Sequence, residues 1–404
     1  MKNTQPESGR RYPLLEKYRK EMSRCVKCGS CSAVCSSYLH ERDESFSARG
    51  RMTLIKAVLD GRLSFSRIFK DRLATCTTCL ACEASCPSNV PVTEIIQAAK
   101  EQAVAESGLG MINSVIATLM KQPALFRAAA WLAPAVLHYS RQVPEGSGGR
   151  RESSTSNVQH SKETGRRGRV AFFPGCAVEY FQPDIGKAAT GVLNAIGYDV
   201  IVPDGLKCCG RPLLSLGDRK KAEKLAERNA ALFEALEVDA IITACASCGL
   251  TFKKDYPKLL RPVSKTPVVL DIHEFLSGRI AGTNLNPVRK SVTIHDPCHL
   301  GRGQGLSRMV RDLLQAIPGI SLVEMEDPDR CCGFGGVMRI THRTLSDGIA
   351  EDKINNIIAT RAAVVATGCP GCRMQIADAL RRHGSDIVVA HPVQLLEEAL
   401  SIAE

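Results

Sequence analysis

Short apolar runs alternate with amphipathic segments in the C-terminal part of the chain, and the same order occurs twice. RVAFFPG at 169–175 and SVTIHDP at 291–297 each predict a buried strand. The expected later elements are helices at about 184–196 and 305–316, strands at 198–204 and 320–326, long helices at about 217–236 and 343–360, and strands at 239–245 and 362–369. PVVLDIHEFL at 267–276 then matches DIVVAHPVQLLEEAL at 386–400. This alternation predicts two duplicated α/β units with mostly parallel sheets.

The N-terminal part has a different pattern. Between 47 and 63, SARGRMTLIKAVLDGRL predicts one helix, capped by Ser47, with an apolar side that includes Ile55 and Val58 and a stop at Gly61. Arg49 and Arg51 stand near its start, where they would either donate hydrogen bonds to a nearby cofactor or remain solvated.

Two further segments separate these parts. Residues 111–139 are apolar but are interrupted by Lys121, Arg127 and two prolines, so they do not predict a membrane span. We expect this segment to pack against the chain's own domains, with docking on a partner or a membrane surface as the alternative. The expected organisation is a head at 1–108, a helical connector at 109–140, a disordered linker at 141–169, and cysteine-rich units at 170–284 and 285–404.

All eighteen cysteines fall into four ordered groups. The first two groups have the spacing C-x2-C-x2-C-x3-C, in which three thiolates hold one [4Fe-4S] cube and the fourth reaches the neighbouring cube. We therefore expect a small helical ferredoxin-like head with two cubanes and crossed ligation. The expected ligands are Cys25, Cys28, Cys31 and Cys86 for the first cluster, and Cys76, Cys79, Cys82 and Cys35 for the second.

The other ten cysteines form two sets of five with nearly equal spacing, which indicates an internal duplication. In each set a single cysteine is followed by a CCG turn and then by a C-x2-C pair. The predicted metal ligands are Cys176, Cys208, Cys209, Cys245 and Cys248 in the first set, and Cys298, Cys331, Cys332, Cys369 and Cys372 in the second. Each set follows the carboxyl ends of predicted parallel strands, the edge at which α/β folds place their sites.

Other uses of cysteine fit less well. A disulfide scaffold requires an oxidising compartment, and the first twenty residues lack the apolar core of a secretory signal. Zinc suits a C-x2-C pair, but five thiolates with two adjacent ones favour a larger, non-cubane iron-sulfur centre. Zinc and a redox dithiol stay open as alternatives for these sets.

The formal net charge of +11 does not by itself indicate nucleic-acid binding. Two cubanes with four thiolates each remove about four positive charges. The chain also has few aromatic residues and no basic and aromatic stripe. We expect no nucleic-acid partner.

With these motifs in place, the chain resembles the glycolate oxidase iron-sulfur subunit family over nearly its whole length. The resemblance rests on the paired cluster motifs, the two CCG units and the stretch ARGRMTLIKAVLDG. The wider superfamily includes one component each of heterodisulfide reductase and of anaerobic glycerol-3-phosphate dehydrogenase. Ser36 departs from the family pattern, because proline usually follows that cysteine.

The resemblance implies an electron-transfer subunit of an oxidoreductase complex. A separate FAD-containing partner would oxidise a 2-hydroxy acid such as glycolate or D-lactate, and this chain would pass the electrons towards quinone. The sequence has no dinucleotide fingerprint, since GRGQG at 301–305 lacks the required spacing. We expect a cytoplasmic location, with peripheral binding to the inner face of the membrane as an alternative.

Two histidines are the candidates for a role beyond conduction. His295 and His299 bracket Cys298 and would ligate metal, relay protons or simply space the turn. The competing catalytic interpretation is disulfide reduction at the five-cysteine sites. His273 and His391 stand at matching positions of the repeat and are expected to be structural.

Overall fold

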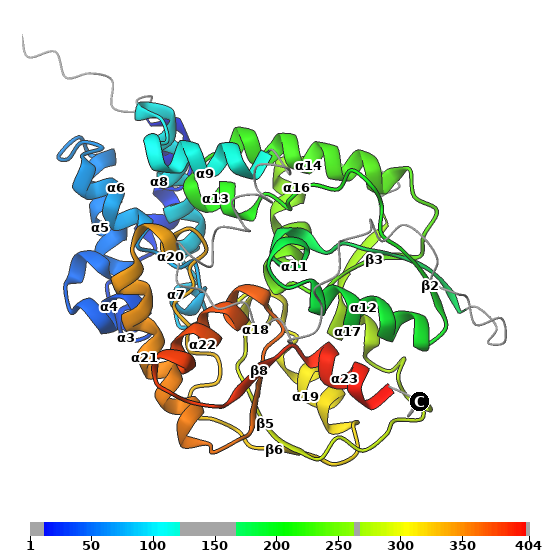
Figure 1. The fold of residues 1–404 in the computed structure, drawn as a ribbon. Helices are drawn as coiled ribbons and strands as arrows, with labels where there is room; N and C mark the ends of the chain where they lie inside the picture. Colours follow the sequence, from blue (N-terminus) through cyan, green and yellow to red (C-terminus); the bar gives the residue numbers. More distant parts are fainter. Residues whose placement is uncertain (1–11, 122–166, 262–266, 401–404) are drawn as a thin grey trace, which may run out of the picture.

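The computed structural model describes residues 12–121, 167–261 and 267–400, and Figure 1 shows their arrangement. The head is entirely helical in this range. Its elements are α1 (Pro13–Glu16), α2 (Arg19–Ser23), α3 (Ser30–Ala33), α4 (Ser36–Glu41), the 3-10 helix η1 (Glu44–Phe46), α5 (Ala48–Leu59), α6 (Arg67–Ala74), α7 (Ala81–Ala84) and α8 (Val92–Ser107).

Helix α5 confirms the prediction for 47–63. The Ser47 side chain accepts a hydrogen bond from the Gly50 backbone, as an N-cap should, and Ile55 and Val58 are fully buried. Those side chains join a core that includes Leu15, Leu73 and Ile95 from the surrounding helices. The head therefore has a hydrophobic core of its own.

Helix α9 (Met111–Lys121) begins the apolar segment and packs against the first α/β unit. Its Ala117 is fully buried in a cluster that contains Leu213 and Leu214. The rest of the predicted connector, 122–140, and nearly all of the predicted linker, 141–166, lie outside the described residues. None of the helices in the described ranges combines the length and the apolar character needed to span a bilayer.

The first α/β unit holds a four-stranded parallel sheet in the order β2-β1-β3-β4. Its elements are β1 (Gly168–Phe172), α11 (Gly175–Tyr180), α12 (Pro183–Ala195), β2 (Tyr198–Ile201), α13 (Arg211–Leu216), α14 (Arg219–Glu234), β3 (Ala240–Thr243), α15 (Ala246–Leu250), the π-helix η2 (Thr251–Asp255), α16 (Tyr256–Leu259), β4 (Val268–Asp271) and α17 (Ile272–Leu276).

The second unit repeats this topology, with a parallel sheet in the order β6-β5-β7-β8. Its elements are β5 (Lys290–Ile294), α18 (Gly301–Gln304), α19 (Ser307–Gln315), β6 (Ile320–Leu322), α20 (Met338–Thr341), α21 (Arg343–Ala359), β7 (Val364–Ala366), α22 (Pro370–Arg382), β8 (Val388–Ala390) and α23 (Pro392–Leu400). The expected fold class is confirmed, and every strand pair in the described residues is parallel.

The two units share one core. Helix α12 of the first unit packs on α23 of the second (Figure 1), and α17 of the first unit packs on α19 of the second. Because α12 is equivalent to α19 and α17 to α23, these two contacts are equivalent, as an approximate two-fold axis between the units requires. Val170, Ile242, Val292 and Val365, from strands of both sheets, belong to the same buried cluster. Because this apolar layer is continuous, the units hold each other in a fixed orientation.

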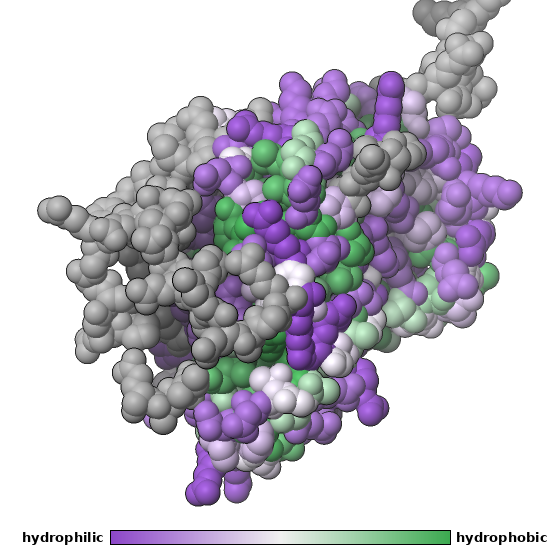
Figure 2. Space-filling view, turned by 90° about the vertical axis from the view of Figure 1, so that its right-hand side faces the viewer, coloured by the Kyte–Doolittle hydropathy of each residue, from purple (hydrophilic) through white to green (hydrophobic). Residues whose placement is uncertain are grey.

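On the face of the molecule drawn in Figure 2, hydrophilic residues are widespread among the described residues, and apolar residues gather nearer the centre. This distribution agrees with the 24% of charged residues in the chain.

Candidate iron-sulfur sites

One cavity in the head brings together the four cysteines expected for the first cubane. Cys25, Cys28, Cys31 and Cys86 line it with Arg49, and Cys28 is exposed to solvent. A second cavity brings together the cysteines expected for the second cubane, with Arg51 at its wall. Its cysteines are Cys35, Cys76, Cys79 and Cys82.

The two cavities are wrapped by loops of the same backbone conformation. Lys27 and Gly29 have left-handed φ angles of 59° and 88°, and Thr78 and Leu80, at the corresponding positions of the second loop, have 53° and 65°. Two left-handed residues separated by one other turn the chain tightly enough for closely spaced thiols to face one centre. The grouping of Cys86 with the first loop and of Cys35 with the second is the grouping that crossed ligation requires.

The donor chemistry of these cavities fits a cluster. Burial, followed by the neighbouring thiols, raises the pKa of Cys82 well above its ordinary value, so a metal charge is needed to hold the thiolate form. The Val90 backbone N–H donates to Cys86 Sγ at 3.5 Å, and Arg51 Nη1 donates to Cys35 Sγ at 3.9 Å. Donors of this kind stabilise iron-sulfur clusters and adjust their potential.

Arg49 and Arg51 differ in role. Arg51 is 1% exposed and also donates to the Arg72 carbonyl and to Thr75 Oγ1, which fixes its guanidinium beside Cys35. Arg49 instead pairs with Glu44, at 2.7 Å between Nε and Oε1. The interpretation as a donor to a cluster sulfur is thus supported for Arg51 only.

In the first cysteine-rich unit, the described sulfurs converge at the carboxyl edge of the sheet. Cys176 and Cys208 lie 3.7 Å apart at their Sγ atoms, and Cys209 contacts both Cys208 and Cys248. Cys245 occupies the N-cap position of α15, and Cys248 lies in the first turn of that helix. The Cβ of an alanine at Gly175 would stand 2.8 Å from Cys248 Sγ, so glycine is needed where the chain passes the sulfurs.

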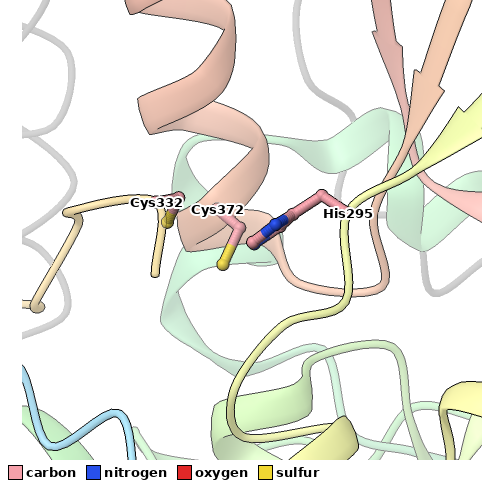
Figure 3. Close-up of side chains that lie close together, drawn as sticks. All are labelled: His295, Cys332 and Cys372. Carbon is pink, nitrogen blue, oxygen red and sulfur yellow. The ribbon is translucent and has the colours of Figure 1, made fainter. Parts of the chain in front are cut away.

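The second unit has a similar edge with different neighbours. Figure 3 shows Cys332, Cys372 and His295, which come from the CCG turn, helix α22 and the segment after β5. One ligand atom from each lies within 4.8 Å of the others. Cys369 occupies the N-cap position of α22, as Cys245 does in α15, and it contacts Cys372. Burial, followed by Cys79, raises the pKa of Cys298 well above its ordinary value.

The glycine of each CCG turn is required by the backbone. Gly210 and Gly333 have φ angles of 91° and 85°, which favour glycine. At Gly333 an added Cβ would also stand 2.3 Å from the Ser346 carbonyl oxygen on α21.

The four groups of cysteines are neighbours in space. Cys79, from the second head loop, packs against the apolar cluster of the second unit that contains Cys331, and Cys331 raises the pKa of the Cys79 thiol well above its ordinary value. The Ala246 N–H, next to Cys245 of the first unit, donates to the carbonyl of Gly368, next to Cys369 of the second, at 3.3 Å, so these two cysteines are also neighbours. The second head cavity therefore adjoins the second unit, and the second unit adjoins the first.

His295 and His299 both lie in this region and are buried. Burial lowers the pKa of His295 to about 3 and that of His299 to about 4, so both rings are neutral near pH 7. Neither ring nitrogen of His295 has a hydrogen-bond partner among the described residues, so the unprotonated one, in either tautomer, is free to bind a metal. His299 Nδ1 lies 2.9 Å from Ser247 Oγ, and its Nε2 lies 3.3 Å from the Thr78 carbonyl oxygen.

The matched positions of His273 and His391 were assigned wrongly from the sequence. His391 accepts a hydrogen bond from the Val393 backbone at the start of α23, whereas the corresponding acceptor at the start of α17 is Asp271. The two imidazoles stack with their centroids 5.1 Å apart. The two histidines are therefore not at equivalent positions of the duplication. His391 is equivalent to Asp271.

Sequence reasoning missed several polar residues around the cysteines. Arg302 donates to the Cys79 carbonyl, and Gln304 donates to the carbonyls of Ala246 and His299. Arg211 donates to Thr78 Oγ1. Two of these residues, Arg302 and Gln304, belong to the GRGQG stretch, which lacks nucleotide-binding spacing. The available signal in the sequence was the position of this stretch shortly after Cys298.

Comparison with known families matches both parts of the chain. Residues 21–90 match the 4Fe-4S dicluster domain, and residues 170–253 and 292–377 each match the cysteine-rich domain called CCG.

Curated relatives match over nearly the whole chain. One component of the fumarate reductase (CoM/CoB) of Methanothermobacter marburgensis is 34% identical over 95% of this chain and 73% of its own length. The probable glycolate oxidase iron-sulfur subunit of Bacillus subtilis is 29% identical over 94% of each chain. One component of the dihydromethanophenazine:CoB–CoM heterodisulfide reductase of Methanosarcina barkeri is 29% identical over 95% of each chain.

Proposed function

Because this chain belongs to the iron-sulfur subunit family that joins a 4Fe-4S dicluster domain to two CCG domains, we propose that it conducts electrons within a 2-hydroxy-acid dehydrogenase complex. In this proposal a partner flavoprotein oxidises glycolate, D-lactate or a similar acid. The chain then passes the electrons towards quinone.

The observation that carries the proposal is the sequence of sulfur contacts through the molecule. The head holds one cavity with the exposed Cys28 and a second, less exposed one; Cys79 of the second cavity packs beside Cys331, and Cys369 adjoins Cys245. Neighbouring centres whose ligands touch lie close enough for rapid electron transfer. Such a line suits a protein whose task is conduction.

We propose that the head cysteines hold two [4Fe-4S] clusters with the crossed ligation described above. Each CCG site, with five thiols, would hold a further iron-sulfur centre of non-cubane type. When bound, these centres supply one-electron redox chemistry. The protein supplies the thiolates, the buried surroundings and the hydrogen bonds to sulfur that set the potentials.

Substrate oxidation is assigned to another chain. The GRGQG stretch, the glycine-rich segment considered for dinucleotide binding, runs from α18 to its left-handed cap at Gly305 and packs beside the cysteine sites. The flavin of a separate protein would therefore accept the hydride from the 2-hydroxy acid.

The proposal is tested with the anaerobically purified chain and its flavoprotein partner. The chain alone should bind iron and should not oxidise glycolate or D-lactate, whereas the mixture should reduce a quinone analogue. Oxidation of either acid by the chain alone would refute the assignment. In a matched mixture that contains the Cys332→Ser variant, quinone reduction should be slower. Reduction of the flavin by substrate should be unchanged, because it occurs on the partner.

A second candidate function is disulfide reduction at the CCG sites, as the names of the heterodisulfide reductase relatives suggest. The contact between Cys245 and Cys369 favours it, because two adjoining centres can deliver two electrons to one disulfide. Steady disulfide reduction by the chain with a low-potential dye would favour this candidate over conduction. A role within an anaerobic glycerol-3-phosphate dehydrogenase would instead require reduction of the chain by the flavoprotein of that enzyme.

A further inference from the structure

His299 lies where three cysteine-bearing segments of the chain meet. Its Nε2 faces the carbonyl oxygen of Thr78, in the loop between Cys76 and Cys79. Its Nδ1 faces the hydroxyl of Ser247, which lies in the first turn of α15 between Cys245 and Cys248. His299 itself follows Cys298 in the chain.

The hydrogen-bond partners fix the direction of each bond. A carbonyl oxygen can only accept, so in the neutral ring the proton lies on Nε2 and is donated to Thr78. Nδ1 is then an acceptor, and the Ser247 hydroxyl donates its single proton to it. The alternative tautomer would set a ring lone pair against the Thr78 carbonyl.

This direction matters because Ser247 has a second neighbour. Its Oγ lies 4.0 Å from Cys369 Sγ, within the range of a hydrogen bond to sulfur. While the hydroxyl proton is donated to His299, it is not available to Cys369. A hydrogen bond to a ligand sulfur raises the reduction potential of an iron-sulfur cluster.

We propose that His299 is a positioning residue that holds the Ser247 hydroxyl away from Cys369 and thereby keeps the second CCG centre at a low potential. The inference rests on the proposed function, since it requires an iron-sulfur centre bound through Cys369. The first unit lacks this hydrogen-bond arrangement, because Ala177 follows Cys176 at the position where His299 follows Cys298. The two centres thus differ although their cysteines are duplicated.

Other hydrogen bonds hold the three segments in place around His299. Gln304 donates to the backbone carbonyls of both His299 and Ala246, at 2.9 and 3.0 Å. The Ala246 N–H donates to the Gly368 carbonyl, at 3.3 Å. Arg211 donates to Thr78 Oγ1, at 3.3 Å. Removing the imidazole therefore leaves Ser247 close to Cys369, with its proton free.

The test is a potentiometric titration of the full chain followed by EPR, with four variants. His299→Ala should raise the midpoint potential of one CCG centre, since Ser247 then donates to Cys369. Ser247→Ala alone should leave the midpoint unchanged, and the double variant should return it to the wild-type value. His299→Gln should also retain the wild-type value, because its amide donates to Thr78 and its carbonyl accepts from Ser247.

His342→Ala is the matched control. His342 also connects the second unit to the head, through Asp71 at 3.1 Å, but it lies away from the contacts of His299. It should leave the potential unchanged. A lowered midpoint potential in Ser247→Ala would overturn the inference, because it would mean that the hydroxyl already donates to Cys369. An unchanged midpoint potential in His299→Ala would overturn it as well. The Ser247→Ala arm decides the matter even if His299→Ala loses its iron. Lack of iron at the CCG sites of the wild type would instead contradict the proposed function.

Discussion

Gly50, the residue between Arg49 and Arg51, is fixed by packing. The Cβ of an alanine there would stand 1.8 Å from the Glu44 carbonyl oxygen, so α5 and η1 would have to separate. Overpacking of this kind typically costs about 1–3 kcal/mol. We expect Gly50→Ala to lower the urea midpoint of the head clearly under anaerobic conditions, and Lys56→Ala, at an exposed position of the same helix, to leave it nearly unchanged. Equal midpoints for the two variants would contradict this account.

Arg51 supplies the second residue-level prediction. Its buried guanidinium uses separate nitrogens for Arg72, Thr75 and Cys35, which a lysine cannot reproduce. Arg51→Lys should lower the reduction potential of the second head cluster, measured by EPR during a redox titration. Arg49→Lys is the control, since Arg49 pairs with Glu44, and a similar shift in both variants would argue against a specific donor at Cys35.

At this scale the sequence identified the residue types but only part of their roles. The cysteine spacing predicted which thiols would gather, because spacing is a local property of the chain. It did not distinguish Arg49 from Arg51, since their difference depends on the carbonyl of Arg72, twenty-one residues beyond Arg51. The equivalence of His391 with Asp271 likewise emerged only from the helix caps.

At the scale of elements, the head is built from two wrapping loops that exchange their last cysteines. Cys35 starts α4 and lines the cavity of the second loop, and Cys86 lines the cavity of the first. Cys35→Ser in the full chain should therefore damage the second cluster and leave the first intact, whereas Cys86→Ser should do the reverse. Iron analysis with low-temperature EPR separates the two signals. Loss of the first cluster in Cys35→Ser would show that ligation is not crossed.

The helices and strands were the most predictable level of the structure. Buried parallel strands are short apolar runs and the long helices are amphipathic, so α14 and α21 appear within about two residues of their expected bounds. Short helices such as α18 and α20 were not predicted. They have only four residues each, too few to show a period.

At the scale of the molecule, the docking of the head could not be read from the sequence. It depends on pairs far apart in the chain, such as His342 with Asp71 and Lys258 with Glu94. The Cys79–Cys331 contact exists only because of that docking. The sequence revealed four groups of cysteines but not the order in which they adjoin.

That order leads to a prediction about the partner. The first head cavity is the exposed end of the line, where Cys28 and Lys27 are exposed and Val26 is 68% exposed, while Cys331 and Cys369 are buried. A partner flavoprotein would therefore exchange electrons at this cavity, and the cationic Lys27 would favour an acidic docking surface. Lys27→Glu should slow association with the partner roughly tenfold at low salt, and the difference should fade as salt screens the charges. Lys56→Glu makes the same charge change elsewhere on the head and should have much less effect in stopped-flow reduction measurements. Equal slowing by both variants would mean that the net charge of the chain, rather than this end of the line, guides the partner.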